Sequence, residues 1–104
     1  MYRITFHNQG KVYEIYARSV GSAAMFGFIE VSELAFGEKS AVVLDPTEEA
    51  LKNEFKQVKR IYIPLQAVIR IDEVDKQGVA RVHANEGGAN VTPFPVMMGG
   101  PDKD

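Results

Sequence analysis

The sequence predicts a mostly β, α+β domain, in which a small, strongly bent sheet or a small barrel carries one short helix inserted before the last strands. Three observations lead to this fold class. Short segments of alternating apolar and polar residues recur along the chain, separated by turn residues. A single strong helix start stands at Asp45, and Pro64 interrupts a run of strand-forming residues. Many short strands with one helix are typical of rolled sheets and small barrels.

The first eighteen residues predict a β-hairpin. Residues 2–7 alternate between apolar and polar side chains, as expected for a strand with one buried face. Residues 8–10 form a short loop in which Gly10 can adopt a positive φ. Residues 11–18 form the return strand, so that two antiparallel strands begin the domain.

The segment that follows predicts less regular structure. Residues 19–27 are ambiguous, and residues 22–25 could form one helical turn. Residues 28–36 are apolar and extended in character, and residues 37–40 indicate a turn. Residues 41–44 predict a short buried strand before the helix.

The helix is predicted over residues 46–57. Asp45 is the N-cap, Pro46 fits the first helical position, and Glu48 completes a capping box. A pair between Glu48 and Lys52, four residues apart, also favours the helix. The apolar residues that recur at helical spacing are Leu51, Phe55 and Val58. The helix therefore presents one narrow apolar stripe to the core.

Three further strands follow the helix. Residues 60–63 form a strand that Pro64 stops, residues 68–74 form the next, and residues 79–83 form the last. A strand halted by proline, a tight turn and another strand resemble the corner of SH3-like and Sm-like barrels. Such barrels host many functions, so this segment predicts a fold and no activity.

The domain is predicted to span residues 1–84, followed by a flexible C-terminal tail over residues 85–104. The tail contains three prolines and four glycines without periodicity, a composition that cannot offset its ordering entropy. Within it, Pro93, Phe94 and Pro95 form a semi-rigid apolar motif suited to filling a pocket.

Composition restricts the class of protein. The chain has no cysteine, which excludes disulfides, thiol nucleophiles and cysteine-ligated zinc. Of its 14 acids and 12 bases, three acids and one base lie in the tail, so residues 1–84 are neutral and unlike a DNA-binding domain. No apolar run approaches the ~20 residues of a membrane helix, and the N-terminus lacks a signal-peptide core. We therefore expect a cytoplasmic protein that binds neither membrane nor DNA.

Five segments carry a resemblance to a known family, and they lie between Met1 and about Gly78. These segments are residues 6–14, 16–20, 27–31, 45–46 and 62–74, and residues 90–95 are also similar. On them the chain resembles a family of short uncharacterised bacterial proteins catalogued as a domain of unknown function. The resemblance implies no activity, ligand or catalytic residue.

Two surface features are candidate binding sites. On the outer face of the hairpin, an aromatic side chain between basic groups could stack a nucleic-acid base and hold its phosphate. The residues of this face are Arg3, Thr5, His7, Tyr16 and Arg18, together with Val12 and Glu14. An ordinary amphipathic hairpin explains the same pattern, and Glu14 favours that explanation.

The second feature is a basic knob after the helix, made of Lys56, Lys59 and Arg60. It could bind RNA or an acidic partner. Compensation of the helix dipole already explains the two lysines, so a binding role is the less economical interpretation.

Catalytic and metal-binding patterns are weak. The two histidines, His7 and His83, lie at strand ends and would have to come close in space to act together. Asp72 and Glu73 point to opposite faces of a strand, which does not favour a metal site, and Asp72 is expected to pair with Arg70 or Lys76. We expect no cofactor, no metal and no enzymatic activity.

These observations predict a small non-enzymatic binding or adaptor module that acts through protein–protein contacts, with a protein partner or a second copy in a homodimer. The first alternative is an Sm-like RNA-binding regulatory protein. The second and least favoured alternative is a small enzyme, because general acid–base chemistry needs a titratable group in a pocket.

Overall fold

The structure is a computed structural model that describes residues 1–37 and 45–84. The described part is mostly β with one short helix, as the sequence predicts. The elements in chain order are β1 (Tyr2–Asn8), β2 (Lys11–Ser22), β3 (Phe28–Ala35), α1 (Pro46–Glu54), β4 (Arg60–Pro64), the 3-10 turn η1 (Leu65–Ala67), β5 (Val68–Glu73) and β6 (Arg81–Ala84).

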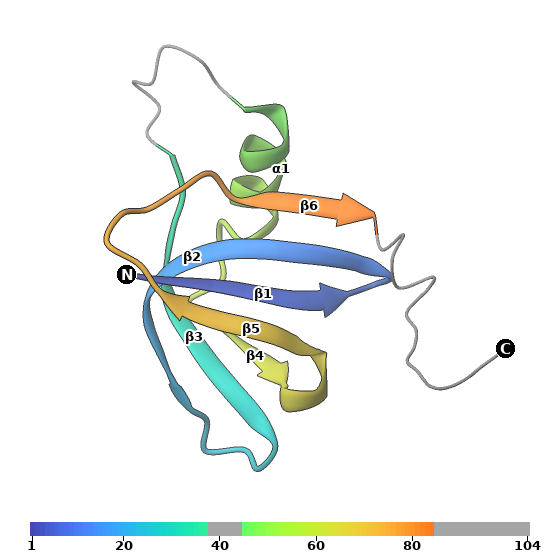
Figure 1. Cartoon of the computed structure of the whole chain (residues 1–104), viewed down its shortest axis with the longest axis vertical. Coiled ribbons are helices and arrows are strands. Elements are labelled where there is room, and N and C mark those ends of the chain that lie inside the picture. Colours follow the sequence, from blue (N-terminus) through green and yellow to red (C-terminus); the bar gives the residue numbers. More distant parts are fainter. Residues whose placement is uncertain (38–44, 85–104) are drawn as a thin grey trace, which may run out of the picture.

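The strands form one six-stranded sheet in the order β4-β3-β2-β1-β5, and β6 pairs with β2 beside this path (Figure 1). All pairs are antiparallel. One side of β2 pairs with β1, whereas its other side is shared, because residues 11–14 pair with β6 and residues 16–22 with β3. The strand therefore curves from one half of the sheet into the other.

The hairpin prediction is confirmed, although the loop consists of Gln9 and Gly10 alone and the return strand continues to Ser22 instead of residue 18. β1 and β2 pair from Tyr2 opposite Ala17 to Asn8 opposite Lys11. The two residues between them, Gln9 and Gly10, both have positive φ, 55° and 76°. Two positive φ values in a two-residue loop are the geometry that matches the twist of a hairpin.

The core lies on the inner, concave face of the sheet. Ile4 and Ile15 face each other across β1 and β2 and are fully buried. The other buried apolar residues packed with them are Phe6, Tyr13, Ala17, Val31, Leu51, Ile63 and Ala80. Helix α1 thus contributes Leu51 to a core otherwise built from strands and the segment before β6.

The start of α1 is as predicted, but only half of the capping box forms. The Asp45 side chain accepts hydrogen bonds from the backbone N–H groups of Thr47 at 2.9 Å and Glu48 at 3.1 Å. Glu48 does not complete the box; it is buried and accepts from the Ala80 N–H at 3.0 Å. Its carboxylate therefore connects α1 to the segment before β6, and the predicted pair with Lys52 is wrong.

The sheet does not close into a barrel. β4 and β5 are the two ends of the strand order, and η1 joins them through a tight turn. Each of these two strands has one neighbour among the described strands, β3 for β4 and β1 for β5. The bent-sheet alternative describes the observed arrangement, and a closed barrel is not observed.

Some predicted boundaries differ from the structure. The helix ends at Glu54 instead of residue 57, because the Lys56 N–H bonds to the Asn53 carbonyl and the last turn tightens. The helical turn considered for residues 22–25 is absent, since β2 continues to Ser22 and an irregular turn follows. The strand predicted for residues 41–44 and the tail over residues 85–104 lie outside the described residues.

Candidate functional site

The outer face of the hairpin joins β1, β2 and β5. Arg3 lies opposite Tyr16 on β2 and opposite Asp72 on β5, and Thr5 lies opposite Glu14 and Arg70. β5 therefore adds Arg70 and Asp72 to the face that the sequence predicts from the hairpin alone.

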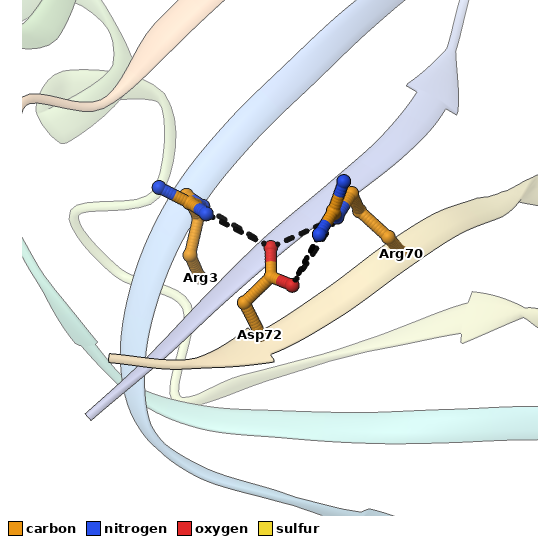
Figure 2. Close-up of polar contacts among 3 residues, drawn as sticks. All are labelled: Arg3, Arg70 and Asp72. Carbon is orange, nitrogen blue, oxygen red and sulfur yellow. Dashed lines mark hydrogen bonds and ion pairs between the residues drawn. The ribbon is translucent and has the colours of Figure 1, made fainter.

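Asp72 lies between two guanidinium groups (Figure 2). Arg3 donates from Nε and Nη2 to one carboxylate oxygen at 3.3 and 3.0 Å, and Arg70 donates from Nε and Nη2 at distances down to 2.9 Å. The bonds from Arg70, followed by those from Arg3, hold the pKa of Asp72 below its ordinary value. The expected pair with Arg70 is confirmed, and the pairing with Arg3 engages a residue that we predicted to bind phosphate.

Tyr16 is buried, with 5% of its surface exposed. A Cβ atom at Gly78 would contact the Tyr16 hydroxyl and lie 2.8 Å from Cζ, so the segment before β6 passes directly over the ring. The hydrogen bonds from Arg3 to Asp72, together with the Tyr16 side chain, raise the pKa of Arg3. The expectation that Tyr16 is available to stack a base is wrong.

The remaining outer-face residues are arranged around Val12. His7 on β1 lies opposite Val12, and Val12 lies opposite His83 on β6. The two histidines are thus two strand spacings apart, roughly 10 Å between their backbones, with Val12 between them. Arg18 is exposed further along β2. Among the described residues, no group of three or more His, Asp or Glu is close enough to hold a metal ion.

A small cavity of about 150 Å³ lies between the end of β1 and β4. His7, Asn8, Phe6 and Phe55 line one part of it, and residues 61–64 line the rest. The residues that line this cavity include no carboxylate that could pair with His7. The residues present do not assemble an acid–base pair around His7.

The predicted basic knob is divided by the structure. Arg60 pairs with Glu30 of the neighbouring strand at 3.4 Å. Lys56 and Lys59 instead line an open groove of about 370 Å³ beside the end of α1, and Lys52 lies with them. The apolar residues that line this groove are Leu34, Phe36, Phe55 and Val58.

One carboxylate also lines this groove. Glu33 has a φ of 57°, which is rare for a residue other than glycine. It interrupts the pairing of β3 with β2, since Leu34 and Ser32 have partners there and Glu33 has none. The groove therefore combines three ammonium groups, one carboxylate and an apolar floor.

A different surface lies at the other end of β3, where the turn after β2 meets η1 (Figure 1). The Leu65 N–H bonds to the Gly27 carbonyl at 2.9 Å, and Phe28 pairs with Pro64. Residues 19–29 and 61–69, which meet here, contain no charged side chain. Most of the exposed large apolar residues of the described chain belong to these two segments: Met25, Phe26, Tyr62, Leu65 and Ile69. We call these five residues the apolar end.

Phe26 is the extreme member of the apolar end. Its side chain is 100% exposed, and Leu65 and Met25 are exposed by 55% and 47%. This surface was not predicted from the sequence. Two uncharged runs, one in a turn between strands and one around Pro64, are the signal that could have found it.

Comparison with protein families decides the membership of the chain. The sequence profile described as "Domain of unknown function (DUF1820)" matches residues 1–96. The chain belongs to the DUF1820 family. This confirms the resemblance found from the sequence, and the match extends past the Pro93, Phe94 and Pro95 motif, which lies outside the described residues. Neither curated proteins nor solved structures gave a match to this DUF1820 chain. Within residues 1–37 and 45–84, no helix has the length and apolar character needed to cross a membrane.

Proposed function

We propose that this DUF1820 chain is a non-enzymatic, cytoplasmic protein-binding module and that the apolar end is its contact surface. The observation that carries the proposal is the full exposure of Phe26 at the tip of the β2–β3 turn, beside the exposed Leu65. Exposed apolar patches on soluble domains mark interaction sites, and aromatic anchors dominate binding energy.

Without a partner, the exposed side chains of the apolar end contribute little to the stability of the fold. The Phe26 ring has no buried surface in the described structure, so it adds nothing to the packing of the fold. Burying one such ring in a partner's pocket contributes about 2 kcal/mol. The absence of charge in both segments lowers the cost of removing water from this surface. A partner that is itself apolar there, or a second copy, fits this chemistry.

The likeness to SH3-like and Sm-like barrels is part of the same proposal. It is supported by the strand order, in which β5 returns beside β1, and by η1, which joins the two ends of the order. Such folds commonly present binding surfaces, but the fold alone assigns no partner.

A pull-down from a native lysate of the source cells tests the proposal. The bait is the full chain, compared with the variants Phe26→Ser and Leu65→Ser. The matched control is Val79→Ser, an exposed apolar residue with 39% exposure outside the apolar end. We expect a protein that the wild type and Val79→Ser retain and the other two lose. Retention of no protein, or equal retention by Phe26→Ser, would overturn the proposal, and light scattering identifies a second copy as partner.

RNA binding in the manner of Sm-like proteins is the second candidate. The exposed guanidinium of Arg70, 67% exposed, supports it together with Arg3 and Arg18. The pairing of Asp72 with two arginines and the burial of Tyr16 weaken it. Filter binding at low and high salt separates the two functions, because phosphate contacts weaken steeply with salt. Lack of RNA affinity at low salt would eliminate this candidate.

A further inference from the structure

The groove beside the end of α1 is a second surface with its own chemistry. It lies at the far end of β3 from the apolar end, since Leu34 lines the groove and Phe28 begins the strand at the turn. Eight residues of strand span roughly 25 Å, so Phe26 and Leu65 lie far from Leu34, whereas Phe55 of the groove and Tyr62 of the apolar end line one cavity. The variants Phe26→Ser and Leu65→Ser are therefore not expected to affect the groove.

The three lysines of the groove come from α1 and from the segment that follows it. Lys52 belongs to α1, which ends at Glu54, whereas Lys56 and Lys59 lie between α1 and β4, and all three line the groove. Among the described residues, the basic side chains that form ion pairs are arginines: Arg3, Arg60 and Arg70. None of the three lysines makes an ion pair with a carboxylate in the part of the chain that the structure describes.

We propose that this groove binds a peptide segment of another protein that combines acidic and apolar side chains. The acidic side chains pair with the lysines, and the apolar ones lie on the floor formed by Leu34 and Val58 next to the aromatic rings. Charge complementarity carries the choice of partner, because the lysines outnumber the single carboxylate, Glu33. The volume of about 370 Å³ suits a few side chains rather than a whole domain.

The same groove is less suited to RNA. The rings of Phe36 and Phe55 stack on each other, with centroids 6.5 Å apart and planes at 13°, and are half-buried instead of presenting free faces to bases. The lack of free ring faces favours a peptide over a nucleic acid.

Selection from a phage library of random dodecapeptides against the full chain tests the proposal. We expect enriched peptides that contain both acidic and apolar residues. The most enriched peptide, labelled with fluorescein, is then titrated with the wild type and with three variants of the chain. Replacing Lys52, Lys56 and Lys59 together by Gln should weaken binding at least about tenfold, and Glu33→Gln should strengthen it about 1.5- to 5-fold. Val58→Ser should weaken binding without changing its dependence on salt.

The matched control for the lysine variant replaces three exposed bases outside the groove, Lys11, Lys76 and Arg81, by Gln. It removes the same charge and should leave peptide affinity unchanged. Equal weakening by the control and the lysine variant would overturn the proposal, as would the enrichment of no peptide or of peptides without acidic residues. Binding of random RNA, or of vesicles of phosphatidylcholine and phosphatidylglycerol, without acidic peptides would assign the groove to a different ligand. Since the Phe26→Ser variant keeps this groove, loss of one function leaves the other measurable.

Discussion

Gly78→Ala should destabilise the domain by overpacking the contact between the segment before β6 and Tyr16. The added methyl would meet the Tyr16 hydroxyl and lie 2.8 Å from Cζ, whereas non-bonded carbon atoms prefer about 3.5–4.0 Å. The ring is buried and cannot move freely into solvent. Overpacking of this kind costs about 1–3 kcal/mol of the free energy of unfolding. For a domain of this size each kcal/mol lowers Tm by about 4–8 °C.

A double-mutant cycle with Tyr16→Phe tests the cause of this loss. Removing the hydroxyl removes the nearest clashing atom, so Gly78→Ala should cost less in a chain that already carries Tyr16→Phe, with a coupling energy of about 0.5–3 kcal/mol. Thermal unfolding followed by circular dichroism gives all four stabilities. If the two substitutions add within about 0.5 kcal/mol, the segment before β6 does not press on Tyr16 and the burial argument is wrong.

Three further predictions concern charged and titrating groups. The pKa of Asp72 is lowered in the folded state, so ionised Asp72 stabilises the fold above its unfolded pKa, and this stabilisation is lost as pH falls through the folded pKa. Asp72→Asn should therefore lower Tm at pH 7, and the difference in Tm from the wild type should vanish in strongly acidic buffer. Glu48→Ala leaves the buried Ala80 N–H without an acceptor and should lower the free energy of unfolding, measured with denaturant, by about 1–3 kcal/mol. An unchanged free energy of unfolding would contradict this role of the Glu48 carboxylate. Burial and the Glu54 carboxylate raise the pKa of Tyr13, so absorbance at alkaline pH should show a tyrosine that ionises above its ordinary range. Glu54→Gln should lower that pKa, and an unchanged titration would contradict the contact.

The parts of the fold that local patterns determine were predictable. Alternation in residues 2–18 gives the hairpin and its two faces, and Asp45 with Pro46 gives the start of α1. The end of the helix was not predictable, because Phe55 and Val58 continue the apolar spacing while the chain has to turn into β4. Helix propensity and apolar spacing within the segment do not indicate where the chain must turn into β4.

The candidate sites depended on contacts between residues far apart in the chain. Arg3 and Asp72 are 69 positions apart, so no sequence spacing indicates their ion pair. Gly78 covers Tyr16 from the segment between the last two predicted strands, for which the sequence predicts no contact. The placement of Leu65 beside the turn that carries Phe26 likewise depends on the pairing of β3 with β4, since the Leu65 N–H bonds to the Gly27 carbonyl. The sequence predicted which residues share the outer face and could not show which of them are covered.

Site-specific photo-cross-linking at position 26 tests the central claim most directly. A benzoylphenylalanine in place of Phe26 keeps an aromatic ring at the fully exposed tip and captures whatever contacts it in the cell. The same group at Val79 is the control outside the apolar end. We predict a discrete protein adduct, either with a partner or with a second copy, from position 26 and not from position 79. Adducts of equal yield at both positions, or none at position 26, would contradict a protein-binding role for the apolar end.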